Sequence, residues 1–207
     1  MSAFPNARYL KGAHEPSQFV APTGVEVAFA GRSNAGKSSA INAITQRQGL
    51  AKTSKTPGAT QLINFFELAP GIRLADLPGY GFAKVPRPLQ THWKRLLETY
   101  FETRDCLKVM FLIVDARRGV SEQDRQMIEY ATACQRAVHI LLTKADKLSL
   151  SQQIQIKRET DRVIGAMATA QLFSATHKLG VDEARKHLKR YLSQRKPGDA
   201  KASPGPQ

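Results

Sequence analysis

Two glycines, a lysine and a serine form a pattern that can hold a phosphate group. Residues 30–42 read AGRSNAGKSSAIN, in which Gly31 and Gly36 are followed by Lys37 and Ser38. Glycines let the backbone curl so that successive N–H groups point at a phosphate, while the lysine reaches the terminal phosphates and the serine hydroxyl can bind Mg²⁺. The pattern predicts a nucleotide phosphate loop, and the alternative is a glycine-rich turn with a surface Lys-Ser pair.

A second motif, DLPG at residues 76–79, could contact the metal and the terminal phosphate. It follows an apolar run, which would place Asp76 at the end of a strand. From there Asp76 can hold Mg²⁺ through a water molecule, and the N–H of Gly79 can sense the terminal phosphate. Alone, Asp-x-x-Gly is usually a turn, but its position downstream of the phosphate loop favours the nucleotide role.

Two further segments can read the base. In TKAD, residues 143–146, the Asp146 carboxylate can accept hydrogen bonds from the N1–H and the 2-amino group of guanine, while the stem of Lys144 packs on the ring. Adenine lacks these donors and would leave the carboxylate unpaired. In FSAT, residues 173–176, the N–H of Ala175 could meet guanine O6, although an ordinary turn is the alternative. The set predicts GTP rather than ATP as the ligand.

These motifs need a scaffold that brings them together, and the pattern of the chain predicts one. Apolar runs alternate with amphipathic stretches, as in a doubly wound α/β fold with a mostly parallel sheet and helices on both faces. Continuous apolar runs indicate central strands that are buried on both faces. Helices are expected directly after the phosphate loop, at 88–101, at 121–134 with Ser121 as its N-cap, and at 180–194. Six strands are expected, at 25–31, 61–68, 71–79, 108–116, 137–146 and 170–176.

Composition and charge point to a polyanionic partner. The chain has 207 residues, and 31 Lys and Arg against 17 Asp and Glu give a formal net charge of +14. This length favours one domain, and this charge favours a nucleic acid partner.

The two cysteines, Cys106 and Cys134, lack metal-ligand spacing, which indicates reduced thiols in the cytosol. The start of the chain lacks a signal-peptide core, and no run approaches the roughly 20 apolar residues of a membrane span, so we expect a cytoplasmic protein without a membrane partner.

The sequence resembles the EngB family, also called YihA or YsxC, of bacterial ribosome-biogenesis GTPases within the TrmE-Era-EngA-YihA-Septin-like P-loop superfamily. The resemblance covers residues 8–193 and rests on GRSNAGKSS, KTPGATQLINFF, DLPGYGFAK, DARRGVSEQD and LLTKADKL. It implies a Ras-like fold, Mg²⁺-dependent binding and hydrolysis of GTP, and a role in maturing the large ribosomal subunit. The family is also associated with normal cell division and septation.

The chain is expected to have three parts. Residues 1–20 would form an N-terminal extension packed on or flanking the domain, and residues 21–194 an EngB-type GTP-binding domain. Residues 195–207 are charged and rich in Pro and Gly, which predicts a disordered basic tail.

The resemblance also implies roles for individual residues. Ser38 and Thr60 would be Mg²⁺ ligands, with Thr56 as the rival of Thr60, and Lys37 would neutralise charge on the transferred phosphoryl group. Asn34 resembles an asparagine that binds K⁺ in related GTPases, which would make turnover potassium-stimulated, and the alternative is a turn-forming asparagine. The expected catalytic residues are Lys37, Thr60 and Gly79.

The expected nucleotide contacts fall in the phosphate loop, the loop before the second strand, the DLPG segment and the two base-reading segments. The expected ligands are GTP or GDP and Mg²⁺, with K⁺ as a candidate. The residues are Gly31, Arg32, Ser33, Asn34, Ala35, Gly36, Lys37, Ser38, Ser39, Gly58, Ala59, Thr60, Gln61, Leu62, Asp76, Leu77, Pro78, Gly79, Thr143, Lys144, Ala145, Asp146, Phe173, Ser174 and Ala175.

Two residues depart from the common GTPase pattern. Tyr80 stands where Ras-type enzymes place a water-orienting glutamine, so hydrolysis should be slow until a partner or a monovalent cation supplies the missing stabilisation. Thr143 replaces the usual asparagine of the base-reading motif. It keeps one hydroxyl but loses the second hydrogen-bonding arm of the amide.

The C-terminal part of the chain carries the clearest excess of positive charge. From residue 178 to 207 there are eight Lys or Arg against three acidic residues, and those in the last helix avoid its apolar stripe. Contact with phosphates of ribosomal RNA in the large subunit is the expected role, with the shape of the RNA rather than its sequence being recognised. The protein is expected to be a monomer. Basic residues that could extend this surface are Lys52, Lys55, Arg73, Lys84 and Arg87.

Two other functions are consistent with parts of the pattern. A P-loop nucleotide kinase would share the phosphate loop, but it would need a pocket for an acceptor substrate and would not need TKAD. An RNA-binding structural assembly factor with vestigial hydrolysis would be consistent with Tyr80.

Overall fold

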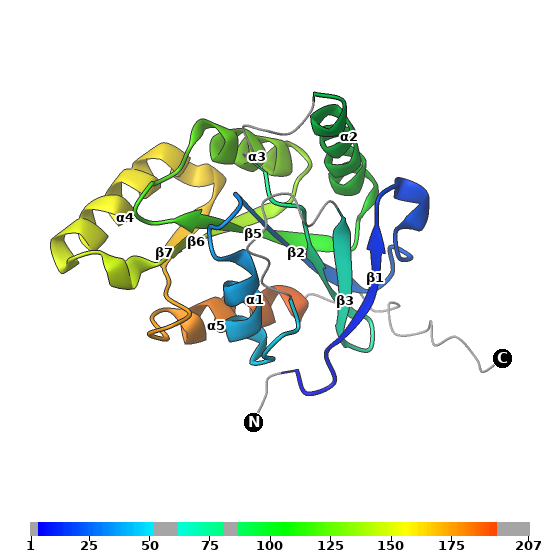
Figure 1. Cartoon of the computed structure of the whole chain (residues 1–207), viewed down its shortest axis with the longest axis horizontal. Helices are drawn as coiled ribbons and strands as arrows, with labels where there is room; N and C mark the ends of the chain where they lie inside the picture. The colour runs from blue at the N-terminus through cyan, green and yellow to red at the C-terminus, as the bar shows by residue number, and fades with distance from the viewer. Residues whose placement is uncertain (1–3, 52–61, 81–86, 194–207) are drawn as a thin grey trace.

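A seven-stranded sheet forms the centre of the molecule. The computed structural model describes residues 4–51, 62–80 and 87–193 (Figure 1). The spatial order of the strands is β1-β3-β4-β2-β5-β6-β7. In chain order they are β1 (Arg8–Ala13), β2 (Val25–Gly31), β3 (Ile63–Ala69), β4 (Ile72–Asp76), β5 (Leu107–Asp115), β6 (Ala137–Thr143) and β7 (Thr169–Leu172).

Most of the sheet is parallel. Strand β2 pairs in parallel with β4 and β5, and β5, β6 and β7 continue the parallel arrangement, while β3 runs antiparallel to β1 and β4. Parallel strands share one carboxyl edge, and ligands of open α/β sheets bind at that edge. The segments that follow β2, β4, β5, β6 and β7 therefore meet in one region.

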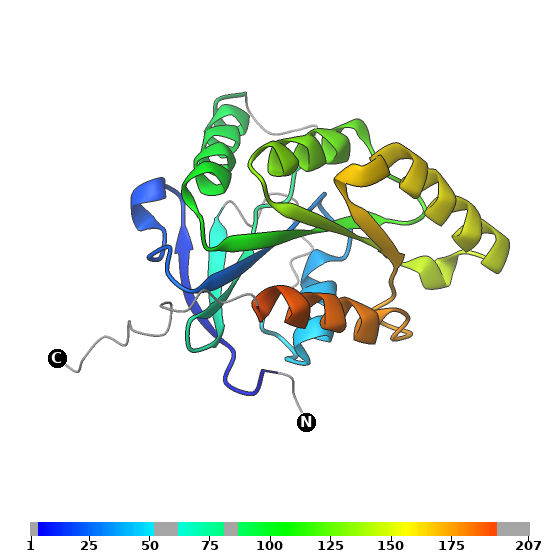
Figure 2. The same ribbon diagram turned by 180° about the vertical axis from the view of Figure 1, so that it is seen from behind.

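Helices cover both faces of the sheet, as Figures 1 and 2 show from opposite sides. Helices α1 (Lys37–Thr45) and α5 (Val181–Leu192) lie together on one face, and α2 (Arg87–Thr103) and α3 (Glu122–Ala133) lie on the other. Helix α4 (Leu150–Ile164) packs beside β7. Each face has its own apolar core, with Ile41 and Leu188 in one and Leu96 and Ile128 in the other. Three short 3₁₀ turns, η1 (Pro16–Gln18), η2 (Ala145–Lys147) and η3 (Gly165–Met167), complete the described elements.

The α/β fold with helices on both faces is confirmed, but the prediction of six strands is wrong. The additional strand is β1, which lies in the predicted N-terminal extension and pairs with β3 at the sheet edge. Five of its six residues are exposed or half-buried, and only Ala13 is buried. Such an edge strand is held by backbone pairing and lacks the apolar run that marks a central strand.

The predicted helices at 88–101, 121–134 and 180–194 are present as α2, α3 and α5. Ser121 caps α3 as expected, and its backbone N–H donates in return to Asp124. Helix α4 was not predicted, because its sequence is mostly polar and only Thr160 and Ile164 are buried.

A buried ion pair links Glu26, near the start of β2, to Arg104, the residue that follows α2. The guanidinium of Arg104 donates to both carboxylate oxygens of Glu26, at 2.6 and 2.7 Å, and the Tyr100 hydroxyl donates to the same carboxylate at 2.8 Å. Arg73 also lies against Glu26, at 3.4 Å, and its side chain is only 11% exposed. Arg73 therefore belongs to this buried cluster and not to a basic surface, contrary to expectation.

Both cysteines, Cys106 and Cys134, are free thiols. Within residues 4–51, 62–80 and 87–193, no helix combines the length and apolar character needed to cross a membrane.

Candidate nucleotide-binding site

The predicted phosphate loop connects β2 to α1. Asn34 and Gly36 both have positive φ, 62° and 100°, so the loop adopts a left-handed backbone conformation at two positions before α1 begins at Lys37. Gly31 is needed for packing, since a Cβ there would lie 2.6 Å from the carbonyl oxygen of Ile113 in β5. The loop therefore lies directly against the end of β5, at the amino terminus of α1, where the helix dipole favours an anion.

Lys37 and Asp76 face each other across the ends of β2 and β4. The ammonium of Lys37 donates to the Asp76 carboxylate, and the two side chains are only 12% and 8% exposed. The sequence predicted that one would contact phosphate and the other would hold Mg²⁺ through water. The structure brings the two groups into direct contact. A carboxylate and the Ser38 hydroxyl are both hard oxygen donors, and this is the donor set that Mg²⁺ prefers.

The backbone after Asp76 runs against the phosphate loop. The N–H of Ser33 donates to the Tyr80 carbonyl at 3.2 Å, and the N–H of Tyr80 lies 3.4 Å from the Gly31 carbonyl. A Cβ on Gly79 would be 3.5 Å from the nitrogen of Ser33. The DLPG segment is thereby placed beside the loop, as the sequence predicted.

The side chain of Tyr80 is directed to α3. Its hydroxyl donates to Asp124 at 2.6 Å, and the same carboxylate caps α3 through Ser121. Burial and the neighbouring Asp124 carboxylate raise the pKa of Tyr80 well above its ordinary value, so the phenol stays protonated. Because its hydroxyl is bound at α3, Tyr80 does not stand in for a water-orienting glutamine in this conformation.

Thr143 connects the base-reading segment to the phosphate loop. Its hydroxyl donates to the carbonyl of Ala35 at 2.5 Å and lies 3.0 Å from the carbonyl of Val114. Lys144, in a left-handed conformation with φ 57°, extends over the loop and donates to the Asn34 carbonyl at 2.6 Å. Two consecutive residues thus bind the loop, so the phosphate and base regions form one unit.

Asp146 is held in the ionised form that guanine recognition requires. Its side chain is 9% exposed, and a hydrogen bond from the Ser174 hydroxyl lowers the pKa of Asp146, with a further contribution from Lys147 at 3.4 Å. His177 also lies 3.8 Å from the carboxylate. The segments containing Asp146 and Ser174 are joined by backbone, since the N–H of Ala145 donates to the Phe173 carbonyl at 3.2 Å.

The structure describes most of the predicted site residues. Those at 31–39, 76–79, 143–146 and 173–175 lie at the carboxyl edge of the parallel strands. Thr56, Gly58, Ala59, Thr60 and Gln61 lie outside the described residues. Leu62 lies next to Gly12 of β1 and lines a hollow that also reaches Asp76.

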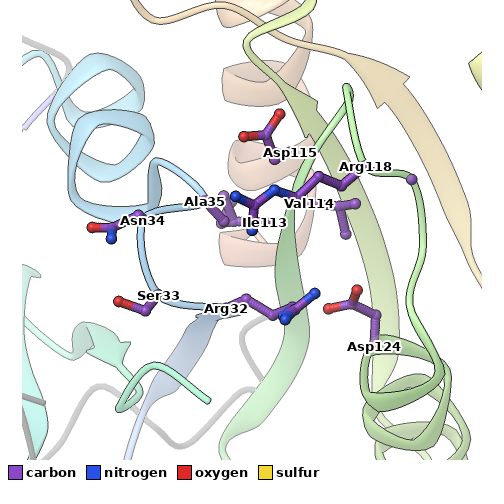
Figure 3. A pocket seen from close by; sticks show the side chains of 10 residues that line it. Arg32, Ser33, Asn34, Ala35, Ile113, Val114, Asp115, Arg118 and Asp124 are labelled. Carbon is purple, nitrogen blue, oxygen red and sulfur yellow. The ribbon is translucent and has the colours of Figure 1, made fainter. Parts of the chain in front are cut away.

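Charged residues at this edge that were not predicted as site residues include Asp115, Arg117, Arg118 and Asp124. A small pocket separates the phosphate loop from the end of β5 and the start of α3 (Figure 3). Arg32 of the loop and Asp124 of α3 point toward one another across it, and Asp115 lies at its upper end in this view. The signal for Asp115 was present in the sequence, since DARRG follows a buried apolar run just as DLPG and TKAD do.

Comparisons with known proteins show which family the chain resembles. A family model described as a 50S ribosome-binding GTPase matches residues 26–144. A protein of Stenotrophomonas maltophilia named "Probable GTP-binding protein EngB" is 50% identical over 183 residues, which cover 86% of this chain and 92% of the relative. A protein of the same name from Coxiella burnetii (strain CbuK_Q154) is 47% identical over 194 residues, which cover 92% of this chain and 95% of the relative.

Solved structures support the same fold. The crystal structure of a probable GTP-binding protein engB has a TM-score of 0.68 at 21% identity, covering 83% of this chain and 100% of that one. The crystal structure of Era with MgGDPNP and nucleotides 1506–1542 of 16S ribosomal RNA has a TM-score of 0.65 at 20% identity, covering 89% of this chain and 60% of that one. At these identities the likeness bears on the fold alone.

Proposed function

The chain belongs to the EngB family of P-loop GTPases, and from that premise we propose that it is a slow, Mg²⁺-dependent GTP switch in assembly of the large ribosomal subunit. The observation that supports this most directly is the Thr143 bond to Ala35, which joins a base-reading segment to a phosphate loop. Through subunit assembly the protein would also be required for normal cell division and septation. Membership of a GTPase family argues against the nucleotide kinase considered from the sequence.

In this proposal each segment at the carboxyl edge has one task. The loop from Gly31 to Ser39 surrounds the phosphates, Asp146 accepts from the guanine N1–H and 2-amino group, and the Ala175 N–H meets O6. Lys144 would lie along the face of the base. When bound, Mg²⁺ would neutralise charge on the phosphates, with Ser38 and Thr60 as ligands and Asp76 contacting it through water.

Hydrolysis would be an in-line attack of water on the terminal phosphorus, breaking its bond to the bridging oxygen and releasing phosphate and GDP. Lys37 would neutralise charge on the transferred group, and the Gly79 N–H would contact it. The Tyr80 hydroxyl, bound to Asp124 at 2.6 Å, supplies no group to orient the water. The intrinsic rate would therefore be low until a partner or cation contributes.

Potassium would be one such contributor, with Asn34 as its ligand. We expect turnover in K⁺ to exceed turnover in Na⁺ by roughly 100-fold, the lower end of the range for one electrostatic contact in the transition state. The test variant is Asn34→Gly, because glycine accepts the φ of 62° and removes the side chain with its amide oxygen. Steady-state phosphate release at equal ionic strength measures the effect. Equal turnover of the wild type in the two salts, or a K⁺ response that survives Asn34→Gly, would contradict this role.

The ribosome-binding surface would lie on α5 and the loop before it. Lys178, Lys186, Lys189 and Arg190 are all exposed there. Arg185, expected on the same surface, is turned inward, because its guanidinium donates to the carbonyls of Ala43 and Ile44 at the end of α1. The side chain of Arg87 and residues 52, 55, 84 and 194–207 lie outside the described part.

The experiment that tests the proposed function is titration of fluorescently labelled protein with purified large subunits. A GTP analogue should support binding more strongly than GDP. Replacing Lys186, Lys189 and Arg190 by glutamine should weaken binding and make the slope of log K against log salt shallower by roughly 2 to 3, one unit for each lost phosphate contact. The matched control replaces Arg125, Arg158 and Arg162, which are exposed on α3 and α4. An equal loss of affinity for large subunits in both triple variants would count against the proposal. So would an affinity that is the same with the GTP analogue and with GDP.

One alternative keeps a specific observation in its favour. Because Tyr80 is held at α3, the protein could be an RNA-binding assembly factor whose hydrolysis is vestigial. In either case we place the protein in the cytoplasm, as a monomer that meets its ribosomal partner there. The two alternatives differ in whether the nucleotide controls binding to the ribosomal partner, and variants of Lys37 distinguish them.

A further inference from the structure

Asp115 is a buried carboxylate at the carboxyl edge of the sheet, outside the segments that would contact the nucleotide. It is the last residue of β5, between the strands that lead to the phosphate loop and to the base-reading segment, and is 7% exposed. Buried carboxylates are costly unless they are paired and hydrogen-bonded. The groups that pair with it therefore indicate what it does.

The first partner of Asp115 is the base-reading lysine. The Lys144 ammonium donates to Oδ2 of Asp115 at 2.9 Å and to the Asn34 carbonyl at 2.6 Å. These two acceptors lie on different elements, one on β5 and one in the phosphate loop. Together they fix the end of a long side chain whose stem would otherwise sample many rotamers.

The second partner holds the carboxylate itself. Arg117 donates to Asp115 from its backbone N–H at 3.1 Å, from Nε at 3.0 Å and from Nη2 at 2.7 Å. This fork uses both carboxylate oxygens, so it fixes the plane of the carboxyl group. Burial raises the pKa of Asp115, but the bonds from Arg117 and Lys144 outweigh it and leave the pKa well below its usual range.

From this arrangement we infer that Asp115, oriented by Arg117, is a positioning residue for Lys144 and thereby sets the affinity for the purine ring of the nucleotide. The inference rests on the proposed function, since it gives Lys144 its place on the base. It differs in kind from the role of Asp146, which selects guanine by hydrogen bonds to its edge. Asp115 would strengthen binding of any purine that Asp146 admits.

The main test is Asp115→Asn, which keeps the shape and one acceptor but removes the charge. We expect the affinity for GDP to fall about tenfold, as for the loss of one charge-assisted hydrogen bond. The affinity for inosine diphosphate, which lacks the 2-amino group, should fall by the same factor, so the ratio of the two affinities is unchanged. Calorimetric titration of each nucleotide in Mg²⁺ measures this ratio. Asp105→Asn is the matched control, because Asp105 is 99% exposed and pairs with Arg136 at 3.3 Å away from the site.

A double-mutant cycle separates positioning from a structural role. In the Lys144→Met background, Asp115→Asn should change GDP affinity less than twofold, because the ammonium through which Asp115 positions the side chain is gone. The full tenfold loss in that background would overturn the inference. So would a changed ratio of guanosine to inosine diphosphate affinity.

A second variant keeps the inference testable if Asp115→Asn does not fold. Asp115→Glu keeps the negative charge between Arg117 and Lys144 but moves the carboxylate by one methylene, and GDP affinity should fall about threefold. Affinity equal to the wild type would overturn the inference. If instead the site does not select guanine, as the proposed function requires, the wild type itself would bind ADP as well as GDP. That result is distinguishable from the outcomes for the Asp115 variants.

Discussion

Replacing Asp146 with asparagine is expected to lower the affinity for GDP by about 100- to 1,000-fold and to create affinity for xanthosine diphosphate. The carboxylate accepts from two donors on guanine, N1–H and the 2-amino group. Asparagine keeps one acceptor but presents an NH₂ group to the 2-amino group of guanine, so two donors face each other. Xanthine carries a carbonyl at that position, which the NH₂ group can donate to. Calorimetry with guanosine, xanthosine and adenosine diphosphates measures all three affinities.

The control for Asp146→Asn is Asp182→Asn, since Asp182 is 87% exposed and pairs with Arg185 on α5. Its nucleotide affinities should match those of the wild type. Because the Ser174 hydrogen bond lowers the pKa of Asp146, its charge is already complete at neutral pH. Lowering the pH from neutral to about 5 should therefore leave base selection unchanged. Unaltered GDP binding by Asp146→Asn would contradict the role given to this carboxylate.

The nucleotide-binding residues that follow the ends of strands could be predicted from the sequence. A phosphate loop, a metal-holding carboxylate and a base-reading carboxylate each follow an apolar run, and β2, β4 and β6 end at those positions. The runs predicted the strands, and the shared carboxyl edge of a parallel sheet explains why Lys37 and Asp76 lie next to each other. Their direct contact agrees with that reasoning.

The effect of Thr143 was predicted only in part. The sequence indicates that threonine lacks one arm of the usual asparagine. The structure shows that the remaining hydroxyl makes the bond of 2.5 Å to Ala35 that joins the two halves of the site. One hydroxyl can join β6 to the phosphate loop only if the two lie close together. That distance is set by the packing of the whole sheet, so the local sequence does not predict it.

Side chains that turn inward could not be predicted from local pattern. Arg185 stands among basic residues on a helix, and only the packing of α5 on α1 places the carbonyls of Ala43 and Ile44 within its reach. Arg73 likewise lies against Glu26, which is 47 positions earlier in the chain. The contacts of Tyr80 with Asp124 and of Lys144 with Asp115 are likewise long-range, so charge and spacing alone did not predict them.

Replacing Lys37 is expected to have the largest effect on hydrolysis. Removing the ammonium that neutralises the transferred phosphoryl group should lower kcat for GTP by about 100- to 1,000-fold. Lys37→Ala also leaves the buried Asp76 carboxylate without its cation, which should cost about 1–3 kcal/mol in the free energy of unfolding. Lys37→Arg keeps a cation beside Asp76 but replaces the compact ammonium by a planar fork, so it should lose hydrolysis while unfolding close to the wild type. Single-turnover phosphate release and urea unfolding measure the two effects.

The same variants decide between a GTP switch and an RNA-binding factor with vestigial hydrolysis. In a switch, the terminal phosphate holds a conformation that the ribosome distinguishes, and Lys37 is one of the groups that contact this phosphate. Folded Lys37→Arg should then bind large subunits equally in a GTP analogue and in GDP, and should not restore subunit assembly in cells that lack the wild type. If it restores assembly as fully as the wild type, hydrolysis is dispensable, and the charged face of α5 rather than the phosphate loop accounts for the function.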